Sequence, residues 1–209
     1  MKSFFDMFKD SARSLRDLRT LTTAGILLAM AIAVRSLSIE VTPDLRISFS
    51  YIPIAVIGML YGPVVCGASS FLLDFLGYII TNKSARAYSP QLALVVLLSG
   101  ILYGAILYHC EFGTKRDTAI STARIVCACV AIALICNLCL NSYFLYTLYV
   151  NKDFTLTGGD WNAFAAYCAP RAIKNLIEIP VKSLILSVLL PMLKAAYDRV
   201  QLQSGRKTA

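Results

Sequence analysis

Six ionisable side chains lie inside segments that are otherwise typical of membrane-spanning helices. A charge at the centre of such a helix costs roughly 2.5–3.5 kcal/mol on an insertion scale. Membrane proteins retain these charges where they form ion pairs, line a water-filled cavity or bind a polar ligand. We therefore expect a membrane protein that holds a charged molecule between its helices. The six residues are Arg35, Asp74, Arg171, Lys174, Glu178 and Lys182.

The composition excludes an ordinary soluble domain. The 209 residues are 57% hydrophobic and 15% charged, whereas soluble domains contain about 25% charged residues. The net charge of +8 would suggest a nucleic-acid partner in a soluble protein. Here the basic residues cluster in flanks and short loops, where the positive-inside rule accounts for them, so we expect no nucleic-acid partner.

The apolar pattern predicts an all-α integral membrane protein with six transmembrane helices and both termini in the cytoplasm. A cytoplasmic segment 1–20 precedes the membrane domain 21–193, and a cytoplasmic tail 194–209 follows it. Lysine and arginine are more frequent in the segments assigned to the cytoplasm, which sets this orientation. The expected spans are 21–39, 51–62, 64–81, 91–110, 124–150 and 165–193.

The second and third spans come from one apolar tract that Tyr61-Gly62-Pro63 interrupts. Proline cannot continue a helix without losing a hydrogen bond, and glycine permits a turn. We therefore expect a tight hairpin of two helices, each shorter than the ~20 residues of a full crossing.

In this topology, charged and polar groups from four spans share one depth. Arg35 and Asp74 lie in the outer halves of their spans, as do Asn141, Arg171 and Lys174. This convergence predicts a cavity that opens to the outside. The alternative is a network of buried ion pairs that only stabilises the bundle, with Asp74 bound to Arg35 or Arg171.

The charges of the last span follow helical spacing. Arg171, Lys174, Glu178 and Lys182 are separated by three, four and four residues and lie within about 80° of one face. Glu178 can bridge Lys174 and Lys182. We interpret Glu178 and Lys182 as a structural ladder, and Arg171 and Lys174 as ligand-binding candidates.

Small residues on the first span indicate a different contact. Ala29 and Ala33 stack on one face, about 140° from Arg35. Small residues at this spacing allow close approach between helices in lipid. We favour contact with a partner protein, and packing within the bundle is the alternative.

The sequence offers little that suggests catalysis. It contains no phosphate-binding loop of the G-x-x-x-x-G-K-[ST] type, so we do not expect it to hydrolyse nucleotide by itself. With a single histidine, His109, general-base catalysis would depend on Asp74 or Glu178. We expect no catalytic residue, cofactor or metal site, although a membrane-embedded enzyme remains an alternative.

A series of short motifs resembles the substrate-binding S components of energy-coupling factor (ECF) vitamin transporters, within the folate (FolT-like) family. Each motif is weak alone, but their order and spacing together are specific, and they cover roughly residues 21–193. The motifs are Leu45-Arg46-Ile47-Ser48-Phe49, Ile52-Pro53, Tyr61-Gly62-Pro63, Asp74-Phe75-Leu76-Gly77-Tyr78, Ser99-Gly100-Ile101-Leu102-Tyr103-Gly104, Asn141-Ser142-Tyr143-Phe144-Leu145 and Arg171-Ala172-Ile173-Lys174 with Pro180.

This resemblance implies a six-helix subunit of the bacterial plasma membrane that captures its vitamin at the outer face with high affinity. The subunit would join a transmembrane coupling protein and two cytoplasmic ATPases. Ala29 and Ala33 match the family's contact with the coupling protein, and Arg35 matches its arginine near the end of the first helix. Loops 40–50 and 82–90 would form a lid.

Folate fits this chemistry. Asp74 can accept hydrogen bonds from the pterin, and basic residues near the mouth suit the dianionic glutamate. Aromatic residues at the predicted outer edge are either interfacial anchors or stacking partners. An S component for thiamine, pantothenate or a queuosine precursor, and a solitary membrane transporter, remain alternatives. The expected substrate contacts are Arg35, Phe49, Asp74, Tyr78, Lys83, Arg86, Tyr88, Asn141, Arg171 and Lys174.

Overall fold

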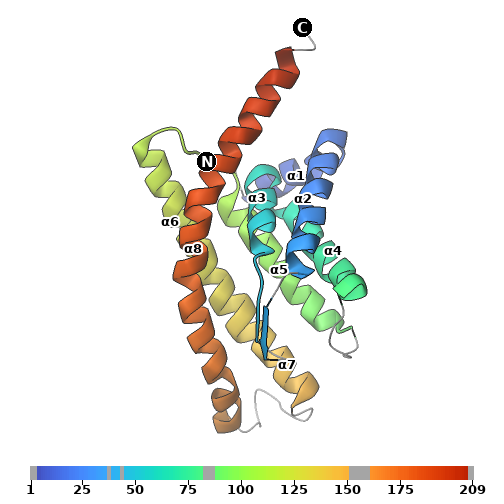
Figure 1. The fold of residues 1–209 in the computed structure, drawn as a ribbon, viewed down its shortest axis with the longest axis vertical. Helices are drawn as coiled ribbons and strands as arrows, with labels where there is room; N and C mark the ends of the chain where they lie inside the picture. The colour runs from blue at the N-terminus through green and yellow to red at the C-terminus, as the bar shows by residue number, and fades with distance from the viewer. Residues whose placement is uncertain (1–3, 37–38, 43–44, 82–87, 151–160, 207–209) are drawn as a thin grey trace.

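The computed structural model describes residues 4–36, 39–42, 45–81, 88–150 and 161–206. Long helices run roughly along one axis of the molecule, and a short β-hairpin follows the second helix (Figure 1). In chain order the elements are α1 (Phe4–Ser14), α2 (Leu18–Ser36), β1 (Ile39–Thr42), β2 (Leu45–Ile47), α3 (Tyr51–Tyr61), α4 (Pro63–Thr81), α5 (Pro90–Leu107), α6 (Lys115–Ala131), the π-helical segment η1 (Ile132–Asn141), α7 (Ser142–Tyr149) and α8 (Trp161–Arg206).

Five helical stretches in the described part of the chain are long and apolar enough to cross a membrane. Helix α3 is apolar too, but its 11 residues rise only about 16 Å, roughly half of the bilayer's hydrocarbon core. The six-span count and the cytoplasmic placement of both termini therefore stay predictions. The five stretches are Leu18–Ser36, Pro63–Ile80, Pro90–Leu107, Lys115–Tyr149 and Trp161–Arg199.

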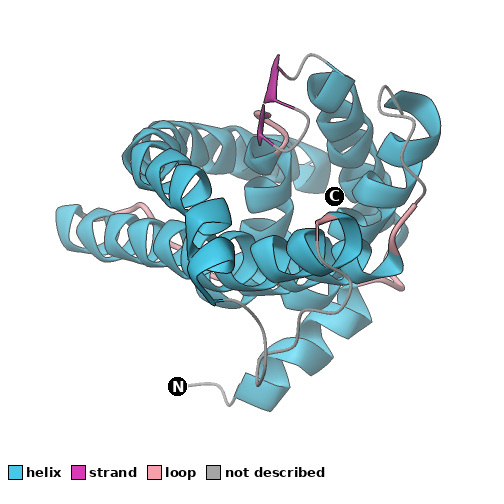
Figure 2. Ribbon diagram, turned by 90° about the horizontal axis from the view of Figure 1, so that it is seen from below, coloured by secondary structure: helices cyan, strands magenta, loops and turns pink. Residues whose placement is uncertain are grey.

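All five apolar stretches are helical, as the sequence predicts. The structure also contains a hairpin of β1 and β2, which the sequence pattern does not predict. The strands pair antiparallel, with Ile39 opposite Ile47 and Thr42 opposite Leu45. Figure 2 shows the hairpin at one side of the helical bundle. From the sequence, we expect a loop at residues 40–50. Its β-branched residues favour an extended backbone, and paired strands satisfy the backbone groups of a segment that is not helical.

The predicted break between α3 and α4 is confirmed. Gly62 adopts a φ of 83°, a conformation that side-chain-bearing residues rarely adopt, and Pro63 begins α4. The last span is longer than expected, because α8 continues to Arg206 through Pro170, Pro180 and Pro191. Most of the expected C-terminal tail is thus part of this helix.

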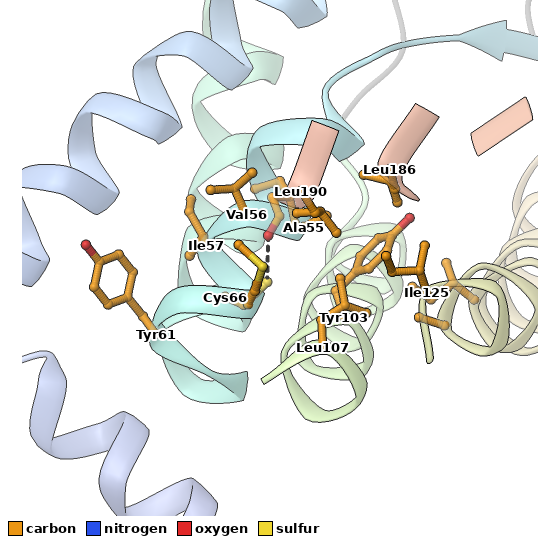
Figure 3. Close-up of a cluster of buried hydrophobic side chains, with 14 of the residues drawn as sticks. Ala55, Val56, Ile57, Tyr61, Cys66, Tyr103, Leu107, Ile125, Leu186 and Leu190 are labelled. Carbon is orange, nitrogen blue, oxygen red and sulfur yellow. Dashed lines mark hydrogen bonds between the residues drawn. The ribbon is translucent and has the colours of Figure 1, made fainter. Parts of the chain in front are cut away.

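Helix α5 lies at the centre of the bundle and packs against α3, α4, α6 and η1. Its Tyr103 and Leu107 are buried among residues of α3, α4, α6 and α8 (Figure 3). The backbones approach closely at Gly104, where an added Cβ would lie 2.4 Å from Pro63 Cα. The small-residue spacing of Gly100 and Gly104 therefore serves packing within the bundle.

Candidate functional site

Two adjoining cavities lie between the helices, with volumes of about 300 and 430 Å³. Four polar residues line both of them: Ser48, Ser50, Asn137 and Asn141. Pockets for small molecules usually measure 300–1,000 Å³. The two cavities together are therefore large enough to hold a molecule of drug-like size, with its two ends in different surroundings.

The larger cavity contains an ion pair between α2 and α4. Both terminal nitrogens of Arg35 lie 3.2 Å from Asp74 Oδ1, and Nη1 also donates to the carbonyl of Leu73 at 3.3 Å. The side chains are 20% and 17% exposed. The two charges therefore offset each other, and both side chains remain accessible at the wall of the larger cavity.

A glycine makes room for this pair. A Cβ added at Gly77 would lie 2.7 Å from Arg35 Nε and 2.8 Å from its Cδ and Cζ. Gly77 is three residues after Asp74, on the same face of α4. The absence of a side chain at Gly77 therefore lets the guanidinium lie against α4 and reach the carboxylate.

The smaller cavity is lined by the charged face of α8. Lys174 Nζ lies 3.3 Å from Glu178 Oε1, and Lys182 pairs with the other oxygen of the same carboxylate. Arg171 is only 6% exposed, and its Nη2 donates to Tyr167 Oη at 3.0 Å. The predicted bridge through Glu178 is confirmed. Glu178 and Lys182 also line the cavity, so a purely structural assignment understates their position.

The two cavities differ in charge. The described lining of the smaller one includes Arg171, Lys174 and Lys182 against the single carboxylate of Glu178, a surplus of two positive charges. In the larger one, the charges of Arg35 and Asp74 balance. Among the residues that the structure describes, basic side chains are therefore concentrated in the smaller cavity.

Uncharged polar groups at the junction come from η1 and from the segment after the hairpin. Asn137 and Asn141 lie in η1, where Ser142 Oγ donates to the carbonyl of Asn137 at 3.2 Å. Such π-helical turns are rare and occur frequently at functional sites. Ser48 and Ser50 follow β2 and lead into α3. The junction can thus donate and accept hydrogen bonds without adding charge.

Sequence reasoning identified Asn141 but missed Asn137 and Asn175. Asn137 Nδ2 lies 3.5 Å from Asn175 Oδ1, which connects η1 to α8. The available signal was spacing, because Asn137 lies four residues before Asn141 and Asn175 lies four residues after Arg171. Each residue therefore extends a polar face that was already recognised.

The predicted aromatic contacts lie outside both cavity linings. Phe49 is 45% exposed. The rings of Tyr78 and Tyr88 lie 5.1 Å apart, and Phe75 packs 5.8 Å from Tyr88. Burial, followed by the nearby charge of Asp74, raises the pKa of Tyr88, so its hydroxyl stays neutral. Lys83 and Arg86, also expected to contact substrate, lie outside the described residues.

Ala29 and Ala33 are both exposed on α2. Arg35, on the same helix, is directed toward α4 and the larger cavity. The expected separation between a charged inner face and a small-residue outer face is therefore present in α2. Contact with a partner protein stays a prediction.

Within the described residues, no group of three or more His, Cys, Asp or Glu side chains could hold a metal ion. Cys129 of α6 and Cys136 of η1 are buried among apolar neighbours.

Comparison with known proteins agrees with this architecture. Residues 19–190 match the family described as the substrate-specific component of ECF transporters. The folate transporter FolT of Leuconostoc mesenteroides is 29% identical over 166 residues, covering 79% of this chain and 81% of the relative. The Clostridium novyi folate transporter FolT is 30% identical over 152 residues, covering 73% of this chain and 76% of the relative.

A solved structure is similar as well. The crystal structure of FolT bound with folic acid superimposes with a TM-score of 0.67 at 26% sequence identity, covering 84% of this chain and 94% of the other. The family consists of transporter components rather than enzymes, and its members are multi-pass proteins of the cell membrane. Because the family match extends over most of the chain and includes both cavities, this protein belongs to the substrate-specific components of ECF transporters.

Proposed function

We propose that this chain is the high-affinity substrate-binding subunit of an ECF-type importer for folate. It captures the vitamin at the outer face and passes it to an ATP-driven coupling module. The observation that carries the proposal is the difference between the described linings of the two cavities: the larger contains Arg35 paired with Asp74, and the smaller contains three basic side chains and one carboxylate. Folate has a corresponding difference between its ends, with a polar pterin at one end and a dianionic glutamate at the other.

The larger cavity suits the pterin. Both nitrogens of Arg35 bond to Oδ1 of Asp74, and within the described residues Oδ2 has no hydrogen bond. Carboxylate oxygens accept from several donors at once. Asp74 can therefore accept from adjacent N–H groups of a pterin while Arg35 holds its side chain in position.

The smaller cavity suits the glutamate. Its two carboxylates would match the surplus charge of Arg171, Lys174 and Lys182, and hydrogen bonds between ionised groups are about twice as strong as neutral ones. The p-aminobenzoyl amide between the two ends would lie at the junction, beside Asn137 and Asn141. Phe49, Tyr78 and Tyr88 remain proposed stacking partners.

The partners follow from the family. We propose that Ala29 and Ala33 meet a transmembrane coupling protein, because both are small, exposed and directed away from the cavities. Two cytoplasmic ATPases would supply energy, since this sequence has no G-x-x-x-x-G-K-[ST] loop. The five long apolar stretches would remain embedded in the lipid bilayer.

Calorimetric titration of the purified protein tests the ligand. We expect folate to bind at a stoichiometry near one, and pteroate, which lacks the glutamate, to bind more weakly. Replacing Arg171 with glutamine should weaken folate binding by about tenfold or more, because a hydrogen bond to a charged group contributes about 1.5–3 kcal/mol. Pteroate binding should change little.

The matched control is Arg116→Gln, which removes the same charge from an exposed position on α6. Equal affinity for pteroate and folate would contradict the placement of the glutamate. Absence of folate binding, with a thermal shift by thiamine, pantothenate or a queuosine precursor, would reassign the substrate. Folate uptake into liposomes that contain this chain alone would instead support a solitary transporter.

A further inference from the structure

Helix α1 is attached to the bundle at the break between α3 and α4. It runs across the long axis of the bundle, at the end where α2 begins (Figures 1 and 2). Ser11 is fully buried, and its Oγ donates to the carbonyl of Tyr61 at 2.7 Å. The same oxygen accepts from the N–H groups of Val64 at 3.0 Å and Val65 at 3.3 Å. Because these N–H groups begin α4 and lack helical partners, Ser11 caps α4 from another helix.

This attachment gives α1 a fixed rotation about its own axis. Met7, Phe8, Ser11 and Ser14 form the docked face and are buried or half-buried. Their spacing of one, three and three residues is that of a single helical face. The remaining surface of α1 is therefore presented outward in a defined order.

The outward surface separates apolar and acidic residues. At 100° per residue, the exposed Phe5 and Ala12 lie on one flank of the docked face, and the exposed Asp6 lies on the other, with the half-buried Asp10 between Asp6 and the docked face. Phe5 is 76% exposed, although it is a large aromatic residue. A helix lying in a membrane surface needs this arrangement, with one flank in contact with lipid and the other with water.

Cations occupy the boundary between these flanks. Lys9 and Arg13 lie between the apolar and acidic flanks of α1. Arg16 lies in the turn that follows α1, and Arg19 lies in the first turn of α2. All four are exposed, and none forms an ion pair with another residue that the structure describes. Long basic side chains at such a boundary can extend to lipid phosphates while their stems contact apolar surface.

From this arrangement we propose that α1 is a membrane-surface helix that binds anionic lipid headgroups through Lys9, Arg13, Arg16 and Arg19, with Phe5 inserted beside the acyl chains. The proposal does not depend on folate as the substrate. Each cation near an anionic surface should contribute roughly a fivefold preference for anionic lipid, which falls as salt rises.

Tryptophan quenching tests the orientation of α1. Trp161 is the single tryptophan in the sequence, so Trp161→Phe gives a silent background. Phe5→Trp and the matched Asp6→Trp are then reconstituted in vesicles of brominated phosphatidylcholine with one third phosphatidylglycerol. We expect bromine to quench Phe5→Trp at least twofold more than Asp6→Trp.

Lipid preference tests the cations. Native mass spectrometry counts the phosphatidylglycerol molecules retained by Lys9→Gln/Arg13→Gln and by the control pair Lys115→Gln/Arg116→Gln, which removes two exposed charges from the start of α6. We expect loss of retained phosphatidylglycerol only in the first pair. Equal loss in both pairs, or equal quenching at the two tryptophan positions, would overturn the proposal. Shielding of Phe5→Trp only after partner subunits are added would assign this flank to protein contact instead.

Discussion

Replacing Gly77 with alanine tests whether close contact between α4 and Arg35 positions the ion pair in the larger cavity. The new Cβ would lie 2.7 Å from Arg35 Nε. To reach an ordinary separation of about 3.5 Å, the guanidinium must retreat by about 0.8 Å. Its bonds to Asp74 and Leu73, already 3.2–3.3 Å long, would then exceed normal hydrogen-bond lengths.

The expected result is a loss of affinity larger than the loss of stability. A displaced Arg35 loses at least one hydrogen bond between charged groups, about 1.5–3 kcal/mol, which weakens folate binding roughly tenfold to a hundredfold. Alanine improves helix propensity by about 1 kcal/mol, which offsets part of the weakened ion pair in the folded protein. Calorimetric titration and thermal unfolding of the same preparation measure the two effects separately.

Two control variants test whether the effect of Gly77→Ala depends on its contact with Arg35. Gly25→Ala, in the helix that carries Arg35, meets no heavy atom within 4 Å and should bind folate as the unmodified protein does. In an Arg35→Ala background, Gly77→Ala should have little further effect, because its target is already gone. Unchanged folate affinity in Gly77→Ala, or an undiminished effect without Arg35, would refute the reasoning.

Two further predictions concern contacts that lie outside the cavities. Ser11→Ala should lower the free energy of unfolding by about 1–3 kcal/mol, because it leaves buried N–H groups of α4 without a partner, and thermal unfolding measures this. Ser14→Ala is its control, since that hydroxyl bonds only to carbonyls of its own helix. Leucine at both Ala29 and Ala33 should leave folate binding unchanged and abolish uptake by the assembled importer, because bulk prevents close helix approach. Loss of binding as well as uptake would mean that these alanines pack within the subunit.

Much of the site could be predicted because the separation of residues along the sequence determines which side chains share a helical face. The face shared by Arg171, Lys174 and Glu178 follows from separations of three and four residues, and the structure confirms the bridge through Glu178. Similar depth and opposite charge left either Arg35 or Arg171 as the partner of Asp74, and the structure pairs Asp74 with Arg35. These inferences needed only the period of a helix and the cost of an isolated charge in lipid.

Other parts of the site depend on relations between helices that no local pattern contains. Asn137 lies in the π-helical segment η1, within hydrogen-bond distance of Asn175 on α8. The rings of Tyr78 and Tyr88 pack against each other and do not line either cavity as the structure describes it. Their contact with a ligand stays a prediction, because no local pattern in the sequence decides how far these rings lie from a bound molecule.

The sequence by itself determined that this is a membrane protein, that a break separates α3 from α4, and which charges share a helical face. Those properties follow from hydropathy, from the missing N–H of Pro63 and from the helical period, all of which act over a few residues. The tertiary structure alone decided that the site consists of two cavities of unequal charge, that Gly77 makes room for Arg35 and that Ser11 caps a distant helix. These features depend on which backbones approach one another, and that is set by packing of the whole bundle.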